Sequence, residues 1–471
     1  MYEEFDYGYI KKERPKNWID DSEGYNQKKG ERDKSELNTM KKLFKYYVDL
    51  GQFYCCNNNL YKYDEENGYL RKIDIADEHL KIKESLEYED RCNISSKQIE
   101  ELIKRLKSEP SINLDFEKIN SNSQYINCKN GVVDIVSKKL LPHDKKYNFT
   151  YYINANYKGD IEDLHYGEET LKFFESSLQG DKFKRKLLME IIGYLISDFN
   201  NAKKAFIFLG KPHSGKSVLT KLITILVGNE NVSNIPFHKL NDRFSNSQLS
   251  ECKLNINAEL DSSPVRKISN FKAIVGGDII SAEYKGRPLF SFKSKTKLLF
   301  CGNAMPEIKD IETTQAFTDR LIFLMFNRST PKEEIDYELE SKLIKEIDVL
   351  FTKAIYALNN LINNNFQFSI PEDSKKFLEE YSNNQNHITE FVRECCIISQ
   401  EEKIHTKSIF ILYQKFCENN CITPYTQNKF SEYIASIEGI QRTRFRENGI
   451  NARGFKGINI KNFNLCGTEQ E

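Results

Sequence analysis

One eight-residue segment constrains the fold of this chain more than any other feature. Residues 210–217 read Gly-Lys-Pro-His-Ser-Gly-Lys-Ser, which fits the pattern G-x-x-x-x-G-K-[ST]. The glycines let backbone N–H groups curl around an anion, and the positive N-terminal end of a following helix stabilises it. An apolar, strand-like run at 205–209 precedes the segment, and a helix-like run at 218–227 follows it. We therefore predict a nucleoside triphosphate site at a strand–loop–helix junction.

The cofactors expected at this loop are ATP and Mg²⁺. Lys216 is predicted to reach the β- and γ-phosphates, and the Ser217 hydroxyl is predicted to hold the metal ion. Contacts with the nucleotide are expected from the loop and the first turn of the following helix. The residues concerned are Gly210, His213, Ser214, Gly215, Lys216, Ser217 and Val218.

Cleavage of a γ-phosphate also needs a carboxylate near the metal ion and a group that positions water. The stretch 253–261 is the candidate, because an apolar run there ends in acidic residues. Glu259 is the preferred general base and a second metal ligand, and Asp261 is the second choice. The usual pair of adjacent acids is absent, since Ala258 precedes Glu259. A solvated loop carboxylate remains the alternative interpretation of Glu259.

Two further polar residues border apolar strand-like runs. Asn303 ends the run that begins at Leu298, and its amide is suited to hydrogen-bond an attacking water or a γ-phosphate. Arg320 precedes the run 321–326, a position from which an arginine can act on the ATP of a neighbouring subunit. Each residue alone is equally compatible with a surface role. Their order and spacing after the loop favour the catalytic interpretation.

The region between residues 203 and 330 alternates short apolar runs with helix-length stretches. The apolar runs are 205–209, 254–257, 298–301 and 321–326. This alternation is typical of a mainly parallel sheet that is covered by helices on both faces. The chain has 471 residues, and at roughly 150 residues per domain it should form about three domains. An Asn-rich stretch at 359–365 and another near 383–386 are interpreted as linkers.

The overall charge does not indicate a particular partner. Lys plus Arg and Asp plus Glu are both 69, which excludes a uniformly basic or acidic protein but permits local basic surfaces. No apolar stretch reaches the roughly 18 residues of a membrane span, and no signal peptide is expected. The cysteines contain no C-x-x-C pattern, so we expect reduced thiols and a cytoplasmic location.

Two cationic elements indicate nucleic acid. Lys285 and Arg287 lie in the turn 285–288, where cations could track phosphates and the following Phe290 or Phe292 could stack on a base. Without its context this turn would be interpreted as a plain solvated hairpin.

The second cationic element lies near the C-terminus. Helix-like runs at 387–399, 406–419 and 426–437 precede a ribbon-like stretch at 441–461. Three helices followed by a basic ribbon predict a winged helix. The expected DNA contacts are Gln427, Asn428 and Lys429 in the third helix and Arg442, Arg444 and Arg453 in the ribbon. Since many winged helices bind proteins, that alternative stays open.

The ordered motifs together resemble superfamily 3 helicases of the AAA+ class, particularly the phage/plasmid primase–helicase group, over about residues 120–460. The resemblance makes 210–217 the Walker A motif, Glu259 the end of Walker B, Asn303 the sensor-1 residue and Arg320 the arginine finger. It also makes 276–288 the Gly-Gly-Asp element with its DNA-contacting hairpin. Upstream, the segments around Asn130-Gly131, Pro142-His143 and Tyr157 are similar to the domain before the motor.

The resemblance implies a P-loop AAA+ motor with a parallel sheet, a preceding α+β domain and a C-terminal winged-helix domain. The expected borders are 1–165 for the N-terminal region, with the pre-motor domain from about 120, then 166–365 for the motor and 385–465 for the winged helix. No spaced acidic trio precedes residue 120, so primase activity is not expected.

The implied function is that of an ATP-dependent DNA helicase which replicates a phage, plasmid or genomic island in bacterial cytoplasm. It would form a homohexameric ring on single-stranded and forked DNA, with origin duplex and a primase or other replication proteins as further partners. Two alternatives remain. One is an origin-binding initiator that uses ATP for assembly only, and the other is a DNA-packaging ATPase.

Overall fold

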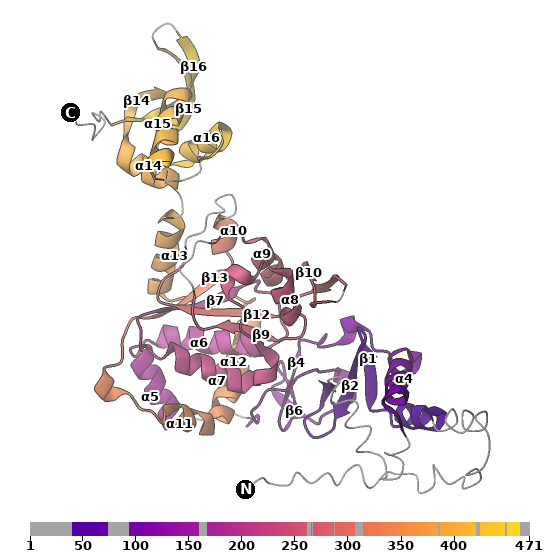
Figure 1. The fold of residues 1–471 in the computed structure, drawn as a ribbon. Helices are drawn as coiled ribbons and strands as arrows, with labels where there is room; N and C mark the ends of the chain where they lie inside the picture. The colour runs from indigo at the N-terminus through magenta and orange to yellow at the C-terminus, as the bar shows by residue number, and fades with distance from the viewer. Residues whose placement is uncertain are drawn as a thin grey trace, which may run out of the picture.

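The computed structural model describes the chain in segments. They are residues 40–73, 94–159, 167–260, 265, 267–286, 288–306, 314–384, 387–420, 424–447 and 450–461. Figure 1 shows an α/β body from which the helix α13 (Glu372–Asn384) leads to a small C-terminal unit. Among the helices in these segments, none is both long enough and apolar enough to cross a membrane.

A five-stranded parallel sheet forms the centre of the body. Its strands, in spatial order, are β13 (Leu321–Phe326), β7 (Ala205–Gly210), β12 (Lys297–Gly302), β9 (Leu254–Asn257) and β8 (Val232–Ser233). The strands are buried almost throughout, as expected for a parallel sheet with both faces covered. The predicted parallel sheet is confirmed.

Helices cover both faces of the sheet because side chains alternate along each strand. Phe206 and Phe208 of β7 belong to one hydrophobic cluster, whereas Ala205 and Ile207 belong to another. The first cluster includes α5 (Glu168–Ser177), α6 (Lys182–Ile196), α7 (Lys216–Val227), α11 (Leu339–Lys345) and α12 (Ile347–Asn363). The second includes α8 (Arg243–Leu249), α9 (Ser269–Gly276) and α10 (Thr314–Thr318).

The residues before the sheet form two small antiparallel sheets. A helix at 40–49 and α4 (Ser96–Lys107) pack on the first sheet, whose strands are β1 (Phe53–Cys56), β2 (Asn59–Asp64) and β3 (Tyr69–Lys72). The second sheet contains β4 (Tyr125–Cys128), β5 (Gly131–Asp134) and β6 (Lys139–Leu141). The Asn130-Gly131 turn joins β4 to β5, as predicted. Residues 126–157 share the hydrophobic cluster of α6, α7 and α12, so this hairpin is built onto the central unit.

The 3-10 helices mark the connections between these elements. They are η1 (Pro110–Ile112), η2 (Phe116–Lys118), η3 (Lys145–Tyr147), η4 (Asn229–Asn231), η5 (Phe237–Lys239) and η7 (Lys332–Glu334).

The C-terminal unit combines three helices with a three-stranded antiparallel sheet in the order β14-β16-β15. Its elements are α14 (His387–Cys395), β14 (Cys396–His405), α15 (Thr406–Asn419), α16 (Gln427–Ser436), β15 (Gln441–Glu447) and β16 (Ile450–Ile460). The prediction of a helix to residue 399 was wrong. Cys396–Ile398 pairs with Ile458–Ile460, because the β-branched isoleucines favour a strand once a partner strand is present.

The interpretation of residues 359–365 as a linker was also wrong. Residues 359–363 form the last turn and a half of α12, and the Asn359 side chain is buried. Its Nδ2 donates a hydrogen bond to the Ile135 carbonyl at 2.9 Å. The asparagine therefore ties α12 to the β4–β6 sheet.

Buried charges gather at the amino ends of β9 and β12. Lys253 donates hydrogen bonds to Asp198 Oδ1 at 2.8 Å and to the Tyr151 hydroxyl at 2.7 Å. Lys297, which is 3% exposed, donates to the Phe199 carbonyl. Burial and then the charge of Lys253 lower the pKa of Lys297 to about 7. This cluster joins the segment around Tyr151 to the central sheet.

We predict that Lys297→Met changes the pH dependence of stability. Between about pH 7 and the ordinary lysine pKa near 10.4, the unfolded chain binds a proton at residue 297 that the folded chain does not. The free energy of unfolding of the unaltered protein should therefore rise with pH over this window, by up to about 1.4 kcal/mol per pH unit. The variant should lack this rise and should gain stability relative to the unaltered protein as the pH falls towards 7.

Urea denaturation between about pH 6 and pH 9 measures this effect. Lys345→Met serves as the control for the replacement of a lysine by methionine, because Lys345 is exposed at the end of α11. Equal pH slopes for Lys297→Met and the unaltered protein would contradict the prediction.

Candidate functional site

The loop between β7 and α7 has the backbone geometry of an anion-binding turn. Gly210, His213 and Gly215 all have positive φ, at 149°, 55° and 92°. A Cβ on Gly210 would lie 2.0 Å from the Phe326 carbonyl oxygen, and one on Gly215 would lie 2.5 Å from Ser177 Oγ. Both positions therefore require glycine. The helix α7 begins at Lys216, so its free N–H groups border the loop.

Lys216 occupies the interior of this loop. Its Nζ donates hydrogen bonds to the carbonyls of Gly210 at 2.8 Å and Lys211 at 2.6 Å, and to Ser214 Oγ at 3.1 Å. It also lies 3.4 Å from Asn303 Oδ1. The side chain is buried, and burial lowers the pKa of Lys216. Two predicted site residues, 87 positions apart, are thus in contact at the ends of neighbouring strands.

Glu259 follows the next strand along the sheet. The Leu260 N–H donates to the Cys301 carbonyl at 2.6 Å, which aligns the segment after β9 with the end of β12. Glu259 is therefore placed beside the strand end that carries Asn303, and its side chain is exposed. Asp261 lies outside the described residues.

Ser217 and Glu259 are the oxygen donors that the sequence predicts for Mg²⁺. Both side chains are exposed, Ser217 in the first turn of α7 and Glu259 after β9. A hydroxyl and a carboxylate suit Mg²⁺, which keeps several water ligands and binds few protein groups. In the described segments no group of three or more His, Cys, Asp or Glu residues is arranged to hold a metal ion. The donor set fits an ion that is held jointly by protein, water and phosphate.

Arg320 is not brought to this site within the same chain. Its carbonyl accepts a hydrogen bond from the Ala205 N–H at 2.8 Å, so it lies at the amino end of β7, whereas the loop begins at the carboxyl end. Six residues of strand at roughly 3.3 Å each separate the two ends by about 20 Å. The guanidinium donates to the Ala316 carbonyl at 2.5 Å. The structure therefore does not bring Arg320 together with Lys216, Asn303 and Glu259 within one chain.

Arg328 is a cation near the loop that sequence reasoning missed. The segment after β13 runs beside the loop, because Ser329 Oγ donates to the Pro212 carbonyl and the Thr330 N–H donates to the His213 carbonyl, both at 2.8 Å. Arg328 donates to Ser176 Oγ, next to the Ser177 that approaches Gly215, and it pairs with Glu334. Its only signal in the sequence is its position just after the strand that borders β7.

The cationic turn lies at the tip of a short hairpin. The hairpin consists of β10 (Ile279–Ala282) and β11 (Phe290–Lys293), with Lys285 exposed at the turn. Arg287 lies outside the described residues. Phe290 stacks on Tyr284 with ring centroids 5.2 Å apart, and Phe292 is buried. Phe292 is therefore not available to stack on a base, whereas Phe290 is half-buried against Tyr284, and its stacking on a base stays a prediction.

The loop of the hairpin is linked to the N-terminal sheet through Glu251. The Tyr284 hydroxyl donates to Glu251 Oε1 at 2.6 Å, and Lys72 Nζ from β3 approaches the same oxygen at 2.6 Å. The ion pair is half-exposed and contributes little by itself. It nevertheless places β3 against the hairpin.

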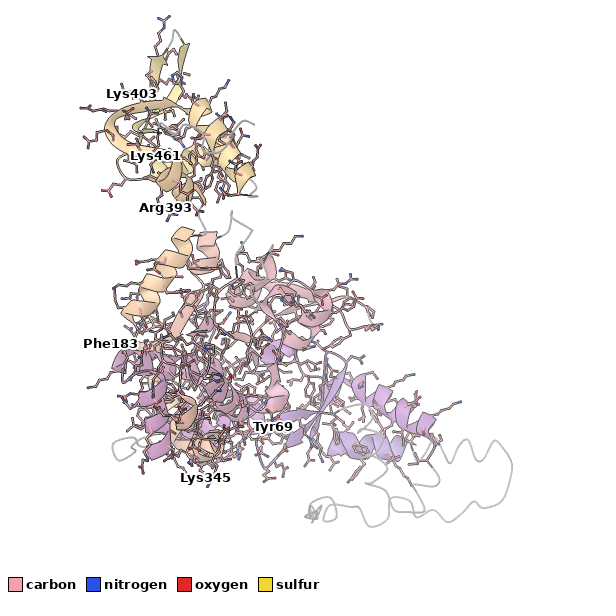
Figure 2. All side chains as sticks on the ribbon, turned by 60° about the vertical axis from the view of Figure 1, so that its left-hand side comes forward. Tyr69, Phe183, Lys345, Arg393, Lys403 and Lys461 are labelled. Carbon is pink, nitrogen blue, oxygen red and sulfur yellow. The ribbon has the colours of Figure 1, made fainter. Side chains whose placement is uncertain are left out.

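The predicted DNA contacts of the C-terminal unit lie on two elements. Gln427 and Asn428 are exposed at the start of α16, and Lys429 Nζ lies 4.5 Å from the centroid of the Tyr425 ring. The exposed arginines of the ribbon share one face, because residues alternate along β15 and Arg444 pairs directly with Arg453 of β16. They are Arg442, Arg444, Arg446 and Arg453. Figure 2 shows this unit beyond α13, apart from the body that holds the loop.

Comparisons with known proteins agree with a role in replication. Residues 32–180 match a family described as D5 N terminal like, and residues 208–320 match a family of unknown function, DUF5906. No curated protein matches the chain.

Solved structures of the NrS-1 C-terminal region are similar in fold. An apo structure, described as the A form, has a TM-score of 0.50 at 12% identity and covers 88% of this chain and 98% of its own. Another A-form structure and a further apo structure, both of residues 305–718, have TM-scores of 0.46 at 12% and 11% identity with the same coverage.

The D5 N-terminal-like match supports the resemblance to the phage/plasmid primase–helicase group and associates the chain with DNA replication. This match begins at residue 32, so the predicted start of the resemblance near residue 120 was too far along the chain. The second match contains Lys216, Glu259, Asn303 and Arg320 within one family region. The first NrS-1 structure shows a shared fold over most of the chain.

Proposed function

We propose that this protein is an ATP-dependent DNA helicase of the superfamily 3, AAA+ type, which replicates a phage, plasmid or genomic island. The observation that supports this most directly is the contact between Lys216 and Asn303, with Glu259 on the adjacent strand end. In the order β13-β7-β12-β9-β8, the strand carrying Asn303 separates the loop strand from the strand before Glu259. A polar side chain thus stands between the phosphate loop and the proposed base, where the γ-phosphate would lie.

Each residue has a defined task in this mechanism. Lys216 would exchange its bonds to loop carbonyls for the β- and γ-phosphate oxygens of ATP. Asn303 would hydrogen-bond the attacking water or the γ-phosphate without adding charge, and Glu259 would accept the proton of that water. Bound Mg²⁺, held through Ser217 and Glu259, would neutralise charge on the phosphate oxygens. Arg328, which precedes the Ser329 that bonds to the loop, would contribute a further positive charge in the same subunit if it left its partner Glu334.

Unwinding of a forked duplex tests the proposal. ATP hydrolysis that is stimulated by single-stranded DNA and coupled to strand separation is expected. ATP-dependent assembly on duplex DNA without turnover would instead favour the origin-binding initiator, which the missing acid at Ala258 supports. In the proposed homohexameric ring, Lys285 of each hairpin would contact the strand in the central pore.

The position of Arg320 predicts complementation between two inactive variants. Arg320→Ala should lower the rate of ATP hydrolysis about 1,000-fold if the guanidinium acts as an arginine finger. Arg320→Ala is then mixed in equal amounts with Lys216→Ala, and the subunits are allowed to exchange. The mixture should recover about a quarter of the unaltered rate of ATP hydrolysis, because about one interface in four combines an intact loop from one subunit with an intact finger from its neighbour. Steady-state phosphate release measures the recovery.

A mixture that is no more active than its separate components would show that Arg320 does not act on the ATP of a neighbouring subunit. Subunit exchange is verified beforehand with differently labelled unaltered protein.

We propose further that the C-terminal unit is a winged helix whose ribbon follows the backbone of duplex DNA. Arg444→Ala should reduce duplex affinity several-fold and should lower the slope of log K against log salt by about 0.9, the value for one phosphate contact. Fluorescence anisotropy at several salt concentrations measures both. Arg393→Ala is the control, since Arg393 is an exposed arginine of α14 in the same unit but outside the ribbon. An unchanged slope for Arg444→Ala would favour the protein-binding alternative.

A further inference from the structure

Helix α13 packs on the central body close to two segments of the candidate site. Phe377 and Tyr381 lie one helical turn apart, so they share a face of the helix. The centroids of their rings lie 5.0 Å and 6.5 Å from that of Phe323 in β13. Both side chains pack in the second hydrophobic cluster, as does Met305 from the segment after β12. Figure 1 shows the start of α13 beside the sheet.

Tyr381 anchors the short segment that begins at Asn303. Its side chain is 8% exposed, and its hydroxyl donates a hydrogen bond to the Pro306 carbonyl at 2.8 Å. Asn303 follows directly after β12, and its Oδ1 lies 3.4 Å from Lys216 Nζ. Pro306 comes three positions later in the same segment. The position of Asn303 relative to the loop therefore depends on two anchors, the strand β12 on one side and Tyr381 on the other.

Asp373, in the first turn of α13, anchors a second segment that borders the loop. Asp373 Oδ2 accepts a hydrogen bond from Asn327 Nδ2 at 3.1 Å and pairs with Lys184 Nζ at 2.6 Å. The Lys184 side chain is 5% exposed, so a buried cation of α6 holds the carboxylate in place. Asn327 lies two positions before Ser329, which donates to the Pro212 carbonyl of the loop. Asp373 thus fixes the start of the segment that runs along the loop.

We propose that α13 is a positioning element of the ATP site. Tyr381 sets the place of Asn303, and Asp373 sets the course of the segment 327–330 along the loop. The strands β12 and β13 are the two neighbours of β7, whose end begins the loop, so the two anchored segments follow the strands on either side of it. This inference rests on the proposed function and adds two residues that act on the reaction through others. The alternative is that both residues only stabilise the attachment of α13.

Tyr381→Phe tests the first anchor in the full-length protein, because it removes only the hydroxyl and keeps the ring against Phe323. A displacement of roughly 1 Å at a catalytic group costs about 100-fold in rate, so a partial loosening of Asn303 should lower kcat for ATP hydrolysis about 10-fold. Affinity for a non-hydrolysable ATP analogue should change little, since Lys216 and the loop are intact. Steady-state phosphate release and equilibrium binding of the analogue measure the two properties.

Tyr157→Phe is the matched control. The Tyr157 side chain is 3% exposed, and its hydroxyl also donates to a backbone carbonyl, that of Lys138 at 3.0 Å. Its ring packs on Phe351 of α12 and not on a segment of the candidate site that Tyr381 anchors. Thermal unfolding should show a similar small loss of stability in both variants, but Tyr157→Phe should keep the unaltered kcat.

Asn327→Ala tests the second anchor. It removes the amide that bonds to Asp373 and leaves the ion pair between Asp373 and Lys184 in place. Since the segment 327–330 supports the loop that would bind the phosphates, affinity for the ATP analogue should fall several-fold. Asn364→Ala is the control, because Asn364 is an exposed asparagine at the end of α12 whose Nδ2 donates to the Gln367 carbonyl at 2.8 Å. It should leave the affinity unchanged.

Hydrogen exchange distinguishes failure of this inference from failure of the proposed function. The backbone amides of residues 303–305 should exchange faster in Tyr381→Phe than in the unaltered protein, whereas Tyr157→Phe should leave them unchanged. This measurement needs no catalysis. An unaltered protein that hydrolyses no ATP would contradict the proposed function, while faster exchange would still identify Tyr381 as the anchor of this segment.

Three results would overturn the inference. One is an unaltered kcat together with unaltered exchange in Tyr381→Phe. Another is an equal fall in kcat for Tyr381→Phe and Tyr157→Phe, which would show that only stability has been lost. The third is an unchanged affinity of Asn327→Ala for the ATP analogue, which would remove Asp373 from the proposed role.

Discussion

Lys216→Ala should lower the rates of ATP hydrolysis and fork unwinding by at least about 100-fold. The Nζ atom is the buried cation within the loop, and its bonds to the Gly210 and Lys211 carbonyls hold it where the β- and γ-phosphates of ATP would bind. Loss of one preorganised group that stabilises charge in a transition state costs roughly 100- to 1,000-fold in rate. Phosphate release and strand separation on a forked duplex measure the two rates.

Lys211→Ala is the matched control, because Lys211 is an exposed lysine of the same loop. It should retain most of the activity. Circular dichroism and thermal unfolding should show that Lys216→Ala is folded, since its side chain contacts the loop and not the hydrophobic clusters. Unwinding that survives Lys216→Ala would exclude the proposed mechanism.

Glu259→Gln should separate nucleotide binding from hydrolysis. The amide keeps the size and polarity of the side chain but cannot accept a proton, and loss of a general base costs about 100- to 10,000-fold. ATP affinity should change little, because Lys216 and the loop backbone are intact. Equilibrium binding of a fluorescent ATP analogue and single-turnover hydrolysis measure the two properties.

Glu230→Gln provides the control for this substitution, as Glu230 is an exposed acid after α7. It should hydrolyse ATP at the unaltered rate. Hydrolysis at the normal rate by Glu259→Gln would show that Glu259 is not the general base. Asp261, the second choice, would then be the next residue to test. Loss of binding together with hydrolysis would show that Glu259 acts mainly as a metal ligand and not as the base.

Much of the fold could be predicted because its signals are local. The apolar runs at 205–209 and 321–326 are long and uninterrupted, and they form the buried strands β7 and β13. Asn130-Gly131 similarly determines a hairpin through its turn geometry. The exceptions depend on tertiary partners. Residues 396–398 become a strand by pairing with β16, and Asn359 is part of α12, where its side chain is bonded to the Ile135 carbonyl.

The sequence predicts which residues belong to the candidate site, but it does not predict how they are arranged in space. The loop motif identifies Lys216 and Ser217 from the spacing of glycines and lysine, and strand ends suggest Asn303 and Glu259. Nothing in the local sequence indicates that Arg328 lies beside the loop or that Arg320 lies about 20 Å away along β7. Which strand ends become neighbours is decided by the crossover order of the sheet.

The sequence by itself determined the glycine-containing loop between β7 and α7, the parallel sheet and the cationic character of the turn and the ribbon. These properties follow from backbone freedom at glycine, from the period of apolar residues and from charge, all of which act over a few residues. Only the tertiary structure decided that Lys216 contacts Asn303 and that Phe290 packs against Tyr284 while Phe292 is buried. Such contacts join segments far apart in the chain, and their energy depends on packing that no local pattern specifies.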